Sequence, residues 1–196
     1  MVMKKIAIFA SGSGTNASNI ISYFSTVKTA KVEAVYVNNP EAYVIKRVKG
    51  TGVETVVFDR HDFYESGVVL ERLQKTETDL IVLAGFLWLV PAEIIVAYRG
   101  HIVNIHPALL PAFGGKGMYG DRVHAAVIAA GLSRSGITIH YVNEKYDSGD
   151  IIFQQECEVL PGDTPETLAA RIHQLEYKYY PAVVEGLLSG PTGDIE

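Results

Sequence analysis

A strand followed at once by a glycine loop and a helix is the feature that most constrains the fold of this chain. Residues 5–10 form an apolar run typical of a buried strand, and Ser11-Gly12-Ser13-Gly14-Thr15-Asn16 follows it directly. Beyond the loop, Ala17, Ile20, Ile21 and Phe24 recur at helical spacing. This layout is typical of α/β proteins, and it leaves backbone amides at a helix N-terminus that can bind an anion.

The same alternation continues along the chain. Further strand patterns occupy residues 32–37, 54–58, 80–84 and 102–106, with helical patterns between them. Two more strands, 136–142 and 151–158, precede a long helix from about residue 165. The continuous apolar run 80–84 predicts a central strand covered on both faces. Asp62 and Glu65 match a capping box, which predicts a helix from residue 62 to about 75.

These patterns predict an α/β fold with a doubly wound, mostly parallel sheet and helices on both faces, as in Rossmann-like proteins. The 196 residues suit a single domain, which we expect over residues 1–188, with a C-terminal tail over 189–196.

Composition excludes several classes of function. The net charge of −5, with no run of Lys and Arg, argues against a nucleic-acid surface. Cys157 is the single cysteine, so an intramolecular disulfide or a thiolate metal cluster is excluded. No apolar stretch reaches the roughly 20 residues of a membrane span, and the N-terminal apolar run is too short for a signal peptide. We therefore expect a cytoplasmic protein that does not associate with membranes.

A second polar feature lies at the end of the strand 102–106. Asn104 and His106 are two residues apart, so their side chains leave the same face of the strand. Pro107 cannot donate to a sheet ladder, so the strand should end at His106. The carboxyl ends of strands are where open α/β sheets bind ligands. A core histidine beside a locally bonded asparagine is the alternative, and these residues alone leave it open.

The glycine loop also has two interpretations. Its residues 12–17 match the dinucleotide fingerprint G-x-G-x-x-G/A, but the second strand ends in Asn38-Asn39-Pro40, without the acid that binds a ribose diol. No G-K-[ST] follows, so a Walker loop is excluded. A phosphate loop and a simple connecting turn both remain open. Residues 85–90 similarly predict either core packing or the apolar wall of a pocket for a flat ring.

Four motifs in order resemble the glycinamide ribonucleotide formyltransferases, within the wider folate-dependent formyltransferase family. The resemblance covers about residues 4–188. The motifs are Ser11-Gly12-Ser13-Gly14-Thr15-Asn16, Leu83-Ala84-Gly85-Phe86, Asn104-Ile105-His106-Pro107-Ala108-Leu109-Leu110-Pro111 and Tyr146-Asp147-Ser148-Gly149. Such an enzyme transfers the formyl group of 10-formyltetrahydrofolate, its co-substrate, to the amine of glycinamide ribonucleotide in purine synthesis, without a metal.

Acyl transfer of this kind needs an oxyanion donor and a proton acceptor. Asn104 can donate an amide N–H to the oxyanion, and a protonated His106 can donate a charged hydrogen bond. Asp147 can keep His106 cationic by raising its pKa.

The resemblance further implies a set of binding residues. Gly12, Ser13, Gly14, Thr15 and Asn16 would hold the substrate phosphate, and Glu176 would line the ribose. Leu87, Trp88, Leu89 and Val90 would border the folate together with Glu144, Lys145 and Tyr146. A cis peptide is implied at Leu110-Pro111.

One departure stands out, because Ser66 occupies the position of an arginine that usually contacts the ribonucleotide. Arg60 and Lys116 are the two cations that could replace it, and for each a solvated surface charge is the alternative. Two other functions also stay open: hydrolysis of formyl-tetrahydrofolate, and a non-catalytic nucleotide-binding module. The sequence leaves the oligomeric state open between a monomer and a homodimer.

Overall fold

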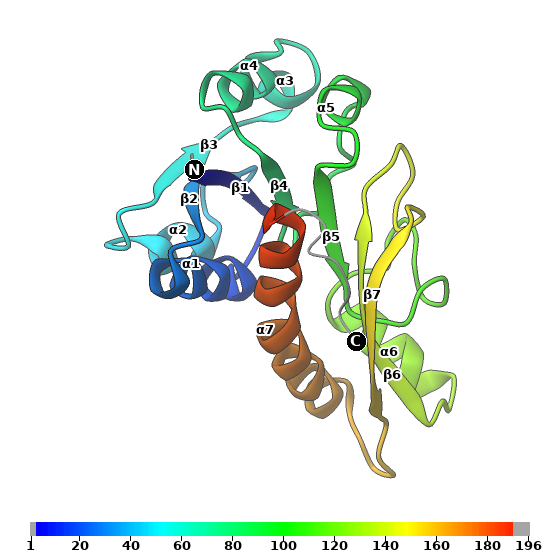
Figure 1. Ribbon diagram of the computed structural model, residues 1–196. Helices are drawn as coiled ribbons and strands as arrows, with labels where there is room; N and C mark the ends of the chain where they lie inside the picture. Colours follow the sequence, from blue (N-terminus) through cyan, green and yellow to red (C-terminus); the bar gives the residue numbers. More distant parts are fainter. Residues whose placement is uncertain (1–2, 190–196) are drawn as a thin grey trace. The chain divides into compact units, whose positions relative to one another are not determined.

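The computed structural model describes residues 3–189, which divide into two compact units. The first unit contains the chain up to Phe86 and again from Tyr179, and the second contains Leu87–Lys178. Figure 1 shows the elements of both units with their labels.

The first unit is built on parallel strands. It contains β1 (Lys4–Ala10), β2 (Ala30–Val37), β3 (Glu54–Val57) and β4 (Leu80–Leu83) in the order β3-β2-β1-β4, and all its strand pairs are parallel. Helices α1 (Thr15–Val27) and α2 (Tyr43–Val48) lie on one face of these strands, and α3 (Arg60–Tyr64) and α4 (Val68–Lys75) on the other (Figure 1). Parallel strands with helices on both faces explain why β4 and residues 6–10 of β1 are apolar.

An aromatic cluster fills part of the core of this unit. The ring of Phe9 stacks on Tyr36 with a centroid separation of 4.7 Å, and it meets Phe86 edge to face at 5.3 Å. Phe58 and Phe63 pack against the same ring. Phe86 therefore serves the core, as one interpretation of residues 85–90 predicted.

The predicted helix from residue 62 to 75 is wrong. The capping box is formed by Asp59 and Asp62: the Asp59 carboxylate accepts the N–H of Asp62 at 2.9 Å, and that of Asp62 accepts the N–H of Asp59 at 3.1 Å. It opens the short helix α3. Gly67, with φ +75°, then interrupts the helical backbone before α4 begins. Ser66 lies in this break, exposed.

The second unit contains α5 (Ala92–Ala97), β5 (Ile102–His106), α6 (Asp121–Ala129), β6 (Arg134–Tyr141) and β7 (Ile151–Glu158). The strands follow the order β5-β6-β7, and both pairs are antiparallel. The long helix α7 (Pro165–Ser189) begins in the second unit, and its residues from Tyr179 belong to the first.

The predicted α/β class with a mostly parallel sheet is confirmed. Within residues 3–189, no helix is both long and apolar enough to cross a membrane. The domain boundary at residue 188 stays a prediction, and the expected tail lies outside the described residues except for Ser189.

Candidate functional site

The end of β5 sets two polar side chains beside strand β6. Antiparallel pairing places Asn104 opposite His140 and His106 opposite Thr138. Directly opposed residues on one face of antiparallel strands have neighbouring side chains. β5 ends at His106, as Pro107 predicted. The pairing thus adds His140, which is 2% exposed and which sequence reasoning missed, to the predicted pair.

Asp147 reaches this group from the loop that follows β6. Its own backbone is left-handed, with φ 50°. The loop is held by Asn143, whose side-chain oxygen accepts the N–H of Lys145 at 3.0 Å and the hydroxyl of Ser148 at 2.9 Å. A Cβ at Gly149 would lie 1.8 Å from the carbonyl oxygen of Tyr141, so only glycine fits there.

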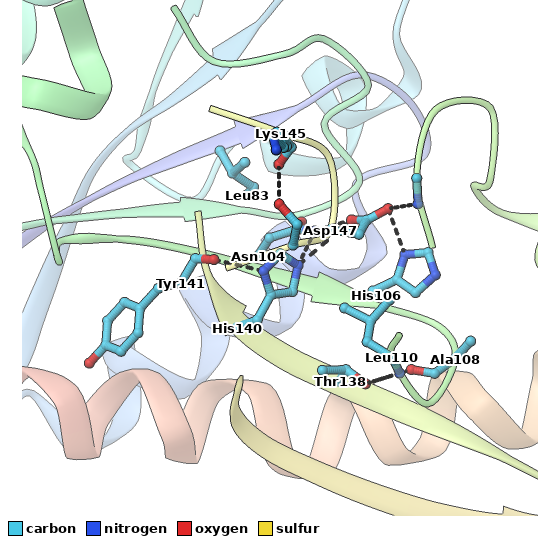
Figure 2. A network of polar contacts seen from close by, with 12 residues as sticks. Leu83, Asn104, His106, Ala108, Leu110, Thr138, His140, Tyr141, Lys145 and Asp147 are labelled. Atoms are coloured by element: carbon cyan, nitrogen blue, oxygen red, sulfur yellow. Dashed lines mark hydrogen bonds and ion pairs between the residues drawn. The ribbon is translucent and has the colours of Figure 1, made fainter. Parts of the chain in front are cut away.

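Four side chains, two of them buried and two half-buried, then form one polar network (Figure 2). The amide nitrogen Nδ2 of Asn104 lies 3.1 Å from Nε2 of His140 and 3.4 Å from Oδ1 of Asp147. The two carboxylate oxygens of Asp147 lie 3.7 Å from Nε2 of His140 and 3.6 Å from Nδ1 of His106. The predicted set Asn104, His106 and Asp147 is therefore brought together.

His106 is oriented by a main-chain oxygen. Its Nε2 lies 2.7 Å from the carbonyl oxygen of Phe113, and because a carbonyl only accepts, this nitrogen carries a proton. Burial lowers the pKa of His106, and although Asp147 and Phe113 raise it, the net pKa stays below its ordinary value. The predicted effect of Asp147 on the pKa is therefore present, but burial outweighs it. A cationic resting state of His106 is not favoured.

Asp147 is ionised in spite of its burial. Burial raises the pKa of its carboxyl, but the neighbouring side chains of His140 and His106 and the N–H of Gly115 together hold that pKa below its ordinary value. The N–H of Gly115 donates to Oδ2 at 2.9 Å. The site therefore contains a fixed negative charge next to an imidazole.

Thr138 organises the turn that follows β5. Its hydroxyl donates to the carbonyl of Ala108 at 2.7 Å and accepts the N–H of Leu110 at 2.9 Å, and Gln154 donates to it at 2.9 Å. The peptide bond Leu110-Pro111 is cis, which confirms that prediction.

The glycine-rich loop of residues 113–120, which follows this turn, contacts two of the three ionisable members of the network. The carbonyl of Phe113 accepts from His106, and the N–H of Gly115 donates to Asp147. Lys116 comes next in the chain and is exposed. Lys116, one of the two candidate cations, therefore directly follows the residue that binds Asp147.

The glycine loop of the first unit has the features of an anion site. The N–H groups of Gly12, Ser13 and Thr15 donate no hydrogen bond within residues 3–189. They lie at the start of the 13-residue helix α1, whose first turn has no acidic residue. Such amides favour an anion. Arg47 donates from Nε to the carbonyl of Ser13 at 2.8 Å, a contact that the sequence did not predict.

Gly14 is needed for packing inside the first unit. Its φ is +72°, and a Cβ there would lie 2.2 Å from Cγ2 of Val44 on α2. The missing side chain therefore makes room for helix α2. At Gly12, by contrast, a Cβ would meet nothing within 4 Å.

The other predicted residues occupy varied surroundings. Val90 is buried, Trp88 and Leu89 are half-buried, and Leu87 is 44% exposed. Glu144, Lys145 and Tyr146 are exposed on the loop that carries Asp147. Glu176 is buried on α7, and Asn16 is buried at the start of α1.

Arg60 is exposed on α3, with its guanidinium over the ring of Tyr64 at 5.6 Å. Ser66 bonds within its own turn, donating to the carbonyl of Asp62 at 3.4 Å. Among residues 3–189, no group of three or more His, Cys, Asp or Glu side chains could hold a metal ion.

Comparison with known proteins identifies the family to which this chain belongs. The family model described as formyl transferase matches residues 4–184. The chain belongs to the formyl transferase family. A phosphoribosylglycinamide formyltransferase of Bacillus subtilis is 38% identical over 191 residues, which cover 95% of each chain. The solved structure of a phosphoribosylglycinamide formyltransferase from Bacillus halodurans has a TM-score of 0.85 and 39% identity, and the match covers 95% of this chain and 96% of that one.

Plant members of the family are longer than this chain. The chloroplastic phosphoribosylglycinamide formyltransferase of Vigna unguiculata is 41% identical over 191 residues, which cover 94% of this chain. The matched part spans 61% of that relative, and 64% of the corresponding protein of Arabidopsis thaliana.

Proposed function

We propose that this protein transfers the formyl group of 10-formyltetrahydrofolate to the primary amine of glycinamide ribonucleotide, a step of purine biosynthesis. The observation that carries the proposal is the network of Asn104, His106 and Asp147. It lies in a chain that is 38–41% identical to proteins named phosphoribosylglycinamide formyltransferase. An amide donor, an imidazole and a carboxylate are the groups that an acyl transfer to an amine requires.

The reaction makes one C–N bond and breaks another. The amine nitrogen attacks the formyl carbon, and negative charge develops on the formyl oxygen. The bond from carbon to N10 of the folate then breaks. The amine loses one proton and N10 gains one, so the proton balance is zero. The protein must stabilise the oxyanion and carry that proton.

Asn104 is proposed as the oxyanion donor. Its Nδ2 reaches Oδ1 of Asp147 over 3.4 Å, beyond the usual 2.7–3.2 Å range of an N–H···O bond. This weakly used hydrogen is available to an incoming oxyanion. Preorganised donors of this kind are among the largest contributions to catalysis, because they stabilise charge that exists only in the transition state.

His106 is proposed as the proton carrier. Its neutral ring, protonated on Nε2, has a lone pair on Nδ1 that accepts the amine's proton. The imidazolium so formed faces Oδ2 of Asp147 at 3.6 Å, which stabilises it. It then returns the proton to N10 as that nitrogen leaves. The cationic form expected from the sequence thus becomes an intermediate rather than the resting state.

The remaining assignments belong to the same proposal. The free amides of Gly12, Ser13 and Thr15 support a phosphate site with Gly14 and Asn16. Glu176 is proposed for the ribose. The partly exposed apolar side chains of Leu87, Trp88 and Leu89, with Val90, support a wall for the folate, and the exposed residues Glu144, Lys145 and Tyr146 complete that site. We also propose a cytoplasmic protein whose partners are these small molecules.

One assay separates this function from its alternatives. Folate turnover is followed spectroscopically with and without glycinamide ribonucleotide. The proposal expects turnover only with the ribonucleotide and formation of the formylated product. Equal turnover without the amine would establish a hydrolase instead. No turnover, with binding of NAD or FAD, would establish a nucleotide-binding module.

A further inference from the structure

His140 occupies a place in the network that the proposed reaction does not use. It is 2% exposed, on β6, directly across the strand pair from Asn104. Its ring touches Asn104 through Nε2, and the same nitrogen faces Asp147 (Figure 2). A buried imidazole can accept a hydrogen bond from a neighbouring amide only in one defined tautomer.

The main chain selects that tautomer. Nδ1 of His140 lies 2.8 Å from the carbonyl oxygen of Tyr141, and a carbonyl can only accept, so Nδ1 carries the proton. In the neutral ring, Nε2 then has a lone pair and no hydrogen. It can accept one hydrogen from the Asn104 amide at 3.1 Å.

The tautomer in turn fixes which way the Asn104 amide points. Nε2 without a hydrogen attracts the NH₂ end of the amide and repels its oxygen. One amide hydrogen is held by His140 at 3.1 Å, within normal hydrogen-bond range. Because the NH₂ group is planar, the second hydrogen is aimed toward Asp147, where the 3.4 Å separation leaves it weakly bonded. That is the hydrogen which the proposed mechanism needs.

We propose that His140 is a positioning residue: its neutral Nδ1–H tautomer holds the NH₂ group of Asn104 in place, so that the hydrogen weakly bonded to Asp147 can pass to the reacting carbonyl oxygen. This inference rests on the proposed formyl transfer. His140 acts only through Asn104.

Protonation of His140 would reverse this arrangement. A hydrogen on Nε2 would face the Asn104 NH₂ group, and the amide would have to turn its oxygen inward, toward the developing oxyanion. The titratable groups that face the ring are Asp147 from the following loop and His106 from β5, and β7 sets Ile151 opposite it. The His140 side chain must therefore be neutral for Asn104 to donate.

The first test compares two substitutions of His140. Glutamine offers an oxygen that accepts from Asn104 and does not titrate, whereas leucine offers no acceptor. We expect His140→Leu to lower kcat about tenfold to hundredfold, less than the hundredfold to thousandfold loss on deleting an oxyanion donor itself. His140→Gln should restore most of kcat. Equal damage by both variants would overturn the proposal.

A double-mutant cycle shows whether His140 acts through Asn104. In an Asn104→Ala background, His140→Leu should cost almost nothing more in kcat, because the group it positions is gone. Thr138→Val is the matched control: it is buried on the same strand and face, and its bonds go to the turn at residues 108–110. Its effect should add to that of Asn104→Ala. Additive costs for His140→Leu would contradict the inference.

A third measurement does not depend on activity. The ¹⁵N chemical shifts of the histidine rings in the wild-type protein should show His140 protonated on Nδ1 and unprotonated on Nε2. The opposite tautomer would overturn the proposal even in an active enzyme. Absence of formyl transfer by the wild type would instead refute the proposed function, so the two failures are distinguishable.

Discussion

Nε2 of His106 donates a 2.7 Å hydrogen bond to the carbonyl oxygen of Phe113, and this bond ties the proposed proton carrier to the glycine-rich loop. The loop also donates from Gly115 to the carboxylate of Asp147. Phe113 itself has φ 55°, a left-handed backbone that a non-glycine residue rarely adopts. The position of this loop and the orientation of the His106–Asp147 pair are therefore linked.

Removing either polar group at the end of β5 should slow turnover strongly while leaving the fold intact. We expect Asn104→Ala to lower kcat about hundredfold to thousandfold, since a lost oxyanion donor costs about 2.7–4 kcal/mol. His106→Ala should lower kcat about hundredfold to ten-thousandfold, the range for a lost general acid–base group. Steady-state kinetics measure the loss, and the thermal midpoint serves as the control for folding. Turnover close to wild type in both folded variants would refute the assigned site.

Neutralising Asp147 should change the titration of His106. Burial lowers the pKa of His106, and the Asp147 carboxylate raises it. Asp147→Asn removes the effect that raises the pKa, so the pKa of His106 should fall further. NMR titration of the ring should show this downward shift, and kcat should drop because the imidazolium intermediate loses its counter-charge. A His106 titration and pH–rate profile that overlay those of the wild type would contradict the role of Asp147.

The same groups make the folded protein less stable in acid. The folded-state pKa of His106 lies below 6.5, so the unfolded chain binds more protons between the two values. The stability that His106 contributes to the folded protein is therefore complete above pH 6.5 and is lost as the pH falls below that value. Asp147, whose folded pKa lies below 3.8, adds a further loss only below that pH.

This effect is measurable by denaturant unfolding at several pH values. The free energy of unfolding of the wild type should decrease between about pH 7 and pH 5, and His106→Gln should flatten that slope. His124 is buried with a lowered pKa as well, so adding His124→Gln should flatten the slope further. An unchanged slope in the double variant would contradict the assignment.

Strands and the polar pair on β5 could be predicted from the sequence because they depend on local patterns. Apolar runs marked β1 and β4, and the spacing of Asn104 and His106 fixed their common face. The sequence pattern did not predict the break between α3 and α4. Asp62 and Glu65 match a capping box, but the box in the structure lies three residues earlier, at Asp59 and Asp62.

What could not be predicted depends on pairing between distant segments. His140 joins the site only because antiparallel β6 sets it opposite Asn104, and one residue of slip would turn it to the other face. The balance of burial against Asp147 at His106 likewise requires the packed structure. The close approach of Val44 to Gly14 could not be predicted either, because it comes from α2 and has no signal in the loop itself.

The two glycines of the glycine loop, Gly12 and Gly14, should differ in how much an added side chain lowers the stability of the protein. Gly14→Val places its Cβ 2.2 Å from Val44 in a left-handed backbone, so we expect a loss of several kcal/mol in stability. Gly12→Ala meets no atom within 4 Å, so stability should change by less than about 1 kcal/mol.

The kinetics of Gly12→Ala then test the loop as a phosphate site. Its methyl group would stand among the free amides, so the KM for the ribonucleotide should rise while the KM for folate stays constant. Inorganic phosphate should compete with the ribonucleotide in the wild type and not with folate. A stable Gly12→Ala variant with an unchanged ribonucleotide KM, together with no competition by phosphate, would exclude the loop from substrate binding.

Two cations, Lys116 and Arg60, are candidates to replace the family arginine. Ser66 is bonded within its own turn and carries no charge, so it cannot act as that arginine. Lys116 is exposed and directly follows Gly115, whose N–H donates to Asp147. Lys116 therefore belongs to the loop that contacts the proposed catalytic pair. Arg60 is exposed too, but its guanidinium already rests on Tyr64. This difference favours Lys116.

We expect Lys116→Ala to raise the KM for the ribonucleotide about tenfold, within the range for a lost charged hydrogen bond, and Arg60→Ala to change it less. The folate KM is the internal control, and Lys49→Ala, which removes an exposed cation after α2, controls for net charge. A larger effect at Arg60 would assign the contact to that residue instead. If both variants bind the ribonucleotide as the wild type does, neither cation replaces the arginine, and the free amides of the glycine loop supply the binding of the substrate.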